Sequence, residues 1–149
     1  MNEWIATLWG YKTQALFDVW SIEHVLSGVS VGSAVRKHHR RLFDRILGRG
    51  HAIESWHLNV TGVLFLGYAW ESVEHYLESG LAGGEVEYWF QGVEMWGNRL
   101  VTDPLMLVVG YWIAKKHHSA VWPCRIASLT WLLIHIFALP HSMALQEYL

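Results

Sequence analysis

The sequence predicts an all-α protein, a single domain in which four membrane-spanning helices form a bundle. Apolar residues make up 52% of the 149 residues and charged residues 16%, against about 25% in an average soluble domain. The charges are collected in two blocks, and four largely apolar stretches are left between them. Each stretch is long enough to cross the roughly 30 Å of a bilayer. The predicted spans are residues 14–35, 58–77, 95–114 and 123–140.

The first predicted span has a face that suits close packing. Gly28 and Gly32 follow His24 at four-residue steps. Small residues at this spacing allow another helix to come near, so we expect a neighbouring helix beside the histidine. Ahead of this span, residues 2–12 predict a short amphipathic helix that lies in the membrane interface.

The basic residues predict which ends of the spans face the cytoplasm. A basic segment, residues 36–41, follows the first span as a loop or surface helix, and Lys115 and Lys116 end the third span. The connection after the second span is acidic and carries no basic residue. The positive-inside rule therefore predicts a multi-pass protein of the inner (plasma) membrane with both termini external. The residues predicted to bind anionic lipid headgroups are Arg36, Lys37, Arg40 and Arg41.

Proline marks both limits of the fourth predicted span. Pro123 stands near its start, where the missing backbone donor costs nothing. Pro140 removes a backbone hydrogen bond and is expected to end or kink the span. The formal net charge of −2 indicates no nucleic-acid partner, and the partners expected are lipids and a second copy of the chain.

Ionisable residues gather at one depth of the predicted bundle. Spans one and three run inward and spans two and four run outward, so depth is read in opposite directions along them. An outer half then holds Asp18, Glu71, Glu74, His75, Asn98, Asp103 and His141, with Glu23, His24 and His135 nearer the middle. Asp18 and Glu78 could instead lie at headgroup level, and Arg99 could pair with Glu94 or Asp103. An ionisable group in a span costs about 2.5–3.5 kcal/mol, so the cluster must be paired, protonated, hydrated or bound to a ligand.

Imidazole and carboxylate groups together are ligands of zinc, iron and manganese, and four helices can hold two such ions. We therefore expect a divalent transition metal in a site that faces outward, in an enzyme acting on a lipid or envelope substrate. The expected catalytic groups are Glu71, Glu74 and Asp103. The expected metal ligands are His24, Glu71, Glu74, His75, Asp103, His135 and His141, with Asp18, Glu23, Asn98 and Arg99 as supporting polar groups.

Two other functions use the same residue types. A proton- or cation-coupled transporter working as an oligomer would load its ions on the carboxylates Glu71 and Glu74. An electron-transfer protein would hold haem between histidines such as His24, His75 and His135. The sequence by itself leaves both alternatives open.

Three motifs resemble those of small bacterial inner-membrane proteins of unknown function and, more distantly, VanZ-like proteins. They are His24-Val25-Leu26-Ser27-Gly28, then Trp70-Glu71-Ser72-Val73-Glu74, then Gly92, Asn98, Asp103 and Gly110. The sequence departs from the motifs of those inner-membrane proteins at three points. His75 stands where they have an asparagine, Val93 stands where they have an aspartate, and the spacing from Asn98 to Asp103 is one residue longer. The resemblance implies a similar fold and polar site rather than a particular activity.

Overall fold

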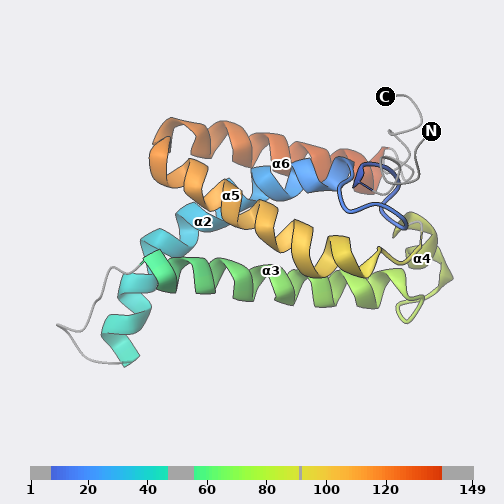
Figure 1. Cartoon of the computed structure of the whole chain (residues 1–149), viewed down its shortest axis with the longest axis horizontal. Helices are drawn as coiled ribbons and strands as arrows, with labels where there is room; N and C mark the ends of the chain where they lie inside the picture. Colours follow the sequence, from blue (N-terminus) through green and yellow to red (C-terminus); the bar gives the residue numbers. More distant parts are fainter. Residues whose placement is uncertain (1–7, 47–55, 91, 139–149) are drawn as a thin grey trace.

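The chain folds into helices throughout the part that the structure describes, residues 8–46, 56–90 and 92–138 of a computed structural model (Figure 1). No strand occurs in these ranges, which confirms the all-α prediction. The elements are α2 (Val19–Ile46), α3 (Trp56–Glu78), α4 (Gly84–Phe90), the π-helix η1 (Asn98–Thr102), α5 (Asp103–Lys116), the 3-10 turn η2 (His118–Ala120) and α6 (Val121–Phe137).

The four long helices match the four predicted spans in order, and the largest difference is in α2. This helix begins at Val19 rather than at residue 14 and continues to Ile46 rather than ending at 35. The basic segment 36–41 therefore extends the helix, because Arg and Lys are good helix formers and no glycine or proline interrupts it there. Residues 139 and 140 lie outside the described residues, so the predicted effect of Pro140 is not seen.

Two short elements were not expected from the sequence. The connection after α3 turns through Gly80 and Gly83, both with positive φ, and forms the short helix α4. The third predicted span starts with a π-helix, η1, which leads directly into α5 at Asp103. A π turn accommodates one extra residue within a helix, and such turns are frequent at functional sites.

The helices α2 and α5 cross at a contact made of glycine. A Cβ on Gly28 would lie 2.5 Å from the backbone oxygen of Leu107, and a Cβ on Gly110 would lie 2.4 Å from the backbone oxygen of Val25. No other residue allows the two backbones to approach this closely. The expectation of a helix packed beside His24 is thus confirmed, and that helix is α5.

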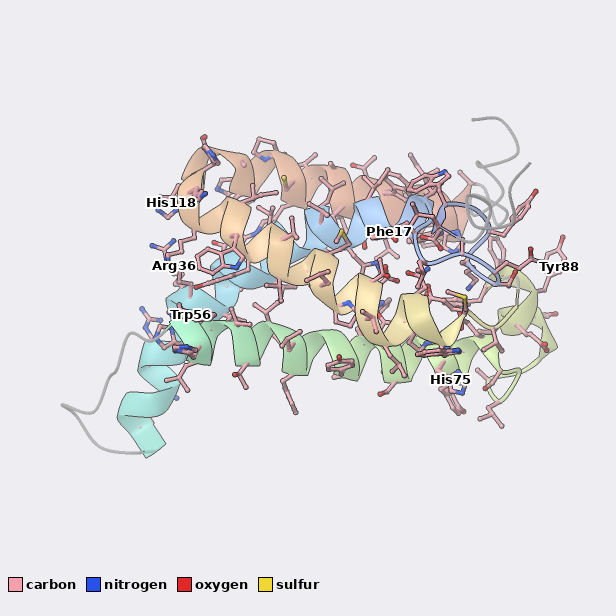
Figure 2. All side chains as sticks on the ribbon, viewed as in Figure 1. Phe17, Arg36, Trp56, His75, Tyr88 and His118 are labelled. Carbon is pink, nitrogen blue, oxygen red and sulfur yellow. The ribbon has the colours of Figure 1, made fainter. Side chains whose placement is uncertain are left out.

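The interior differs between the two ends of the bundle, which we name here. The basic end is the one at which α2 carries its arginines and α5 is connected to α6. The carboxylate end is the one that contains the start of α2, the end of α3 and the π-helix η1. Figure 2 shows Arg36, Trp56 and His118 at the basic end and His75 and Tyr88 at the carboxylate end. Toward the basic end the interior contains small apolar clusters, formed by Val29, Ala114 and Val121 and by Val63, Leu107 and Tyr111, beside the buried polar residue Asn59.

Large apolar side chains lie mostly on the outside of the helices. Phe65, Ile126 and Phe137 are 72%, 63% and 79% exposed, whereas polar and charged side chains outnumber apolar ones among the buried described residues. Within the described ranges, no helix has both the length and the apolar character needed to cross a membrane. Residues 2–7 of the predicted interfacial helix lie outside the described residues. Residues 9–12 are not helical, which contradicts the prediction there: Trp9 forms an isolated β-bridge with Phe17, and Lys12 is buried inside the protein.

Candidate metal centre at the carboxylate end

A buried polar cluster fills the carboxylate end of the bundle. Its side chains come from the segment before α2, from the first turns of α2, from the last turns of α3 and from η1 with its preceding connection. We call it the carboxylate cluster. Its members are Lys12, Asp18, Ser21, His24, Glu71, Glu74, Glu78, Glu94, Asn98, Arg99, Thr102 and Asp103.

Glu78 is the residue on which the cations of the cluster converge. It is 0% exposed and forms ion pairs with both Lys12 and Arg99, and it also accepts a hydrogen bond of 3.1 Å from the backbone N–H of Glu94. Arg99 lies a further 3.5 Å from Glu94 and 3.7 Å from Glu71. Glu78 is therefore an ion-paired residue of the protein interior, and its depth in a membrane stays a prediction. The expected pairing of Arg99 with Glu94 is confirmed; no ion pair joins Arg99 to Asp103.

Asp18 begins α2 and connects that helix to η1. The backbone N–H of Ser21 donates to Asp18 Oδ1 at 2.9 Å and the backbone N–H of Asp18 donates to Ser21 Oγ at 3.2 Å, which is a reciprocal N-terminal cap. Asn98 Nδ2 donates to the other oxygen of Asp18 at 3.2 Å, and Ser21 Oγ donates to Asp103 Oδ1 at 3.2 Å. Asp18 is 1% exposed, so it too is a buried member of the cluster.

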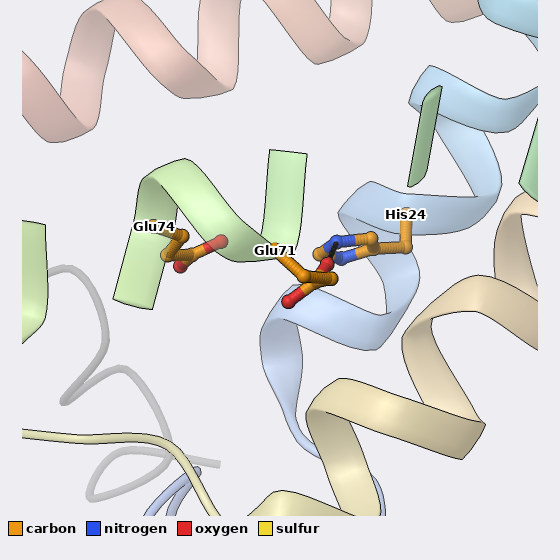
Figure 3. A group of neighbouring side chains, drawn as sticks. All are labelled: His24, Glu71 and Glu74. Carbon is orange, nitrogen blue, oxygen red and sulfur yellow. Dashed lines mark hydrogen bonds and ion pairs between the residues drawn. The ribbon is translucent and has the colours of Figure 1, made fainter. Parts of the chain in front are cut away.

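His24 and Glu71 face each other across α2 and α3, with Glu74 further along α3 (Figure 3). The carbonyl oxygen of Trp20 lies 2.9 Å from His24 Nδ1, and since a carbonyl only accepts, Nδ1 carries a proton and donates it. His24 Nε2 then points at Glu71 Oε1, 3.1 Å away. A neutral imidazole and a carboxylate are both acceptors at this contact, so a proton or a cation must lie between them. Metal-ligating histidines are typically oriented by such a bond from the other nitrogen.

Two groups of candidate ligand atoms share the Glu71 side chain. One group consists of His24, Glu71 and Glu74, the other of Glu71, Glu94 and Asp103, and within each group the ligand atoms all lie within 4.8 Å of one another. One oxygen of each of Glu71, Glu94 and Asp103 is buried and accepts no hydrogen bond from the described residues. Buried carboxylate oxygens without donors are costly unless a proton or cation satisfies them.

The carboxyl groups of the cluster outnumber its cations, because Lys12 and Arg99 are the only permanently charged cations in it. Burial and the neighbouring carboxylates have a large effect on the pKa of Glu94, which lies in the connection before η1. Burial raises the pKa of its carboxyl to about 10, and the nearby charges of Asp103, Glu74, Glu71 and Glu78 act in the same direction. The cluster therefore favours the binding of positive charge, whether as protons or as metal ions.

A cavity of about 720 Å³ adjoins the first ligand group. It lies over α2, between α3 and α6, and Val86, Trp89 and Phe90 of α4 line it as well. His24 and Glu74 are in its wall. No hydrogen bond or ion pair within the described residues holds the Glu74 carboxylate, so this group is available to a ligand.

The other predicted site residues are spread around this centre. His75 is exposed, belongs to neither ligand group and lies 3.1 Å from Arg99 Nη1. His135 and Glu23 line the cavity; His135 packs edge-on against Trp20, and Glu23 accepts a hydrogen bond of 2.5 Å from Ser128. The fourth predicted histidine ligand, His141, lies outside the described residues.

Sequence reasoning did not include several residues of the cluster among the predicted site residues. The sequence pattern places Lys12 in the membrane interface and gives no signal for Ser21. The predicted ligand set contains neither Glu78 nor Glu94. The sequence does contain one signal. Nine of its eleven lysines and arginines lie on the predicted cytoplasmic side, and the two exceptions are Lys12 and Arg99. Isolated cations on an acidic side are expected to be paired, and both of them pair with Glu78.

The π-helix η1 covers Asn98–Thr102, and the side chains of both Asn98 and Asp103 face the cluster. No protein-family model matches this chain, nor does any curated protein or solved structure. The resemblance to small inner-membrane and VanZ-like proteins accordingly stays a prediction.

Proposed function

We propose that this chain is an integral membrane enzyme whose carboxylate end faces the external side. The distribution of side chains supports the proposal. Phe65, Ile126 and Leu129 project from the middle of the helices and are exposed, while Glu71, Glu78 and Asp103 are buried. A water-soluble domain rarely exposes large contiguous apolar surface, whereas a lipid-facing surface requires it. Arg36, Lys37 and Arg41, at the basic end, are then placed to contact anionic headgroups.

The carboxylate cluster is proposed to bind zinc, iron or manganese, as one ion or as two. The observation that carries this proposal is the sharing of Glu71 by two ligand groups, in which one oxygen each of Glu71, Glu94 and Asp103 accepts no hydrogen bond from the described residues. In sites with two metal ions a carboxylate commonly lies between the ions. His24 has the neighbour expected of a metal ligand, because its Nδ1–H is bound to a backbone carbonyl.

The proposed reaction is hydrolysis of a lipid or envelope substrate. A divalent metal held by the carboxylate cluster would lower the pKa of a bound water molecule to about 7. Glu74, in the cavity wall, would act as general base toward that water, and His24, Glu71, Glu94 and Asp103 would then hold the metal. Arg99 and Lys12 hold Glu78 and so keep the end of α3 in place beside η1.

The metal proposal is tested by elemental analysis of protein purified without chelator. We expect about one or two equivalents of a transition metal in the wild type. Glu71→Gln removes a ligand from both groups and should lose most of the metal. Glu85→Gln, the same substitution at an exposed position in α4, is the matched control and should retain it. A wild type that binds no metal at micromolar supply would refute the proposal.

The membrane proposal is tested by labelling in intact cells, in a Cys124→Ser background. A cysteine placed near Glu87 should react with an impermeant thiol reagent and a cysteine near Arg45 should not, because the basic end is proposed to be cytoplasmic. Equal labelling of the two positions would contradict the proposed orientation.

Reconstituted vesicles separate the enzyme from the proposed alternatives. We expect no uptake of divalent cations driven by a pH gradient. Uptake that Glu71→Gln abolishes would instead favour the ion-coupled transporter working as an oligomer. A haem absorption band in the purified protein would favour the electron-transfer alternative and direct attention to His24 and His135, both of which line the cavity.

A further inference from the structure

The cavity beside the first ligand group has two chemically different parts. Its volume, about 720 Å³, is within the range of about 300–1,000 Å³ typical of small-molecule sites. Most of its wall is apolar, and the carboxylate and imidazole groups of the site are a minority of the lining. The apolar wall combines aliphatic and aromatic side chains, and its aliphatic part is formed by Val31, Leu66, Leu77, Leu107 and Leu132 with Val86.

The arrangement of the helices leaves this cavity accessible from the side. Both α3 and α6 pack against α2, but among the described elements they make no extensive contact with each other. Leu66, in the cavity wall, is 46% exposed, so the wall continues to the outer surface of the bundle. A molecule can therefore reach His24 and Glu74 from the apolar surroundings of the helices.

We infer that the cavity binds a lipid with a single hydrocarbon chain and a phosphate ester head. The chain lies between α3 and α6 against the leucine wall, and the head lies at His24 and Glu74. A hydrocarbon chain can bury its apolar surface against this wall, whereas free inorganic phosphate has no apolar surface to bury there. The anionic head rests on the proposed function, because only bound metal ions would reverse the excess negative charge of the carboxylate cluster.

A photo-crosslinking experiment tests the inference in bilayer nanodiscs, with hexadecyl phosphate that carries a diazirine in its chain. We expect cross-links at cavity residues such as Leu132 in excess of those at Leu129, which is exposed on the same helix. Leu132→Trp should lower the labelling of the cavity by about tenfold, because the larger side chain takes the place of several methylene groups. Leu129→Trp is the matched control, and its labelling should equal that of the wild type.

Metal content, measured on the same samples, keeps this inference distinct from the proposed function. Leu132→Trp should retain the metal, since it changes no ligand. Equal labelling of Leu132→Trp and Leu129→Trp, with metal present, would overturn the lipid site alone. Loss of labelling when chelator is added supports a head held by metal, whereas unchanged labelling would overturn the phosphate head. If labelling appears only after residues 139–149 are deleted, the cavity binds that segment of the chain and not a lipid. This outcome would also overturn the inference.

Discussion

The two ends of this bundle are held together by different forces. From the middle of the bundle toward the basic end, glycines bring α2 and α5 into backbone contact and small apolar clusters lie beside them. At the carboxylate end, the interior consists of charges that are stable only when each has a partner. The comparison teaches that close packing stabilises the first region, whereas the second depends on its counter-charges.

Removing a cation from the carboxylate end should give the largest loss of stability. Arg99→Met leaves buried Glu78 and Glu94 with one cation fewer, and breaking a buried ion pair in this way costs about 3–5 kcal/mol. Arg125→Met, at the basic end, is the matched control because its side chain is only half-buried and its Nε donates to Ser30. Thermal unfolding in mild detergent measures both variants. Equal midpoints would show that ion pairs do not hold the carboxylate end together.

Adding a methyl group at the crossing of α2 and α5 should give the next largest effect. In Gly110→Ala the new Cβ meets backbone atoms of α2, which cannot turn aside, and overpacking of this kind costs about 1–3 kcal/mol. Gly84→Ala is the matched control, since no atom lies within 4 Å of a Cβ there. Metal content should be unchanged in Gly110→Ala protein that remains folded. If the two alanine variants unfold at the same temperature, close packing is not what joins these helices.

The smallest effect is expected from Glu94→Gln, in its dependence on pH. The pKa of Glu94 is raised from 4.5 to about 10 in the folded protein, so its contribution to stability is fully present below about pH 4.5 and is lost as pH rises toward 10. Chelator-treated wild type should therefore lose stability with rising pH more steeply than the variant. Parallel pH profiles of the two midpoints would mean that Glu94 does not titrate in this way.

Much of the fold follows from local pattern, because hydrophobic stretches, glycine spacing and charge blocks are properties of short segments. The order of the four long helices, the approach of a helix to His24 and the polarity of the bundle were all predicted. The π-helix η1 and the short helix α4 were not, since they depend on where Arg99, Asn98 and the glycine turns must lie relative to other elements. The sequence predicts a loop or a surface helix for residues 36–41, and the structure shows that these residues continue α2. Helix propensity favours this outcome because arginine and lysine are good helix formers.

The sequence by itself determined that carboxylate and imidazole groups share one end of a helical bundle, because depth along each helix follows from residue number. Only the tertiary structure decided which of them meet. Rotation of each helix about its axis places Glu71 against His24 and turns His75 outward, although the two residues are four positions apart on α3. Lys12 joins the cluster because the chain folds back toward Glu78, and no local pattern specifies a contact between residues so distant in sequence.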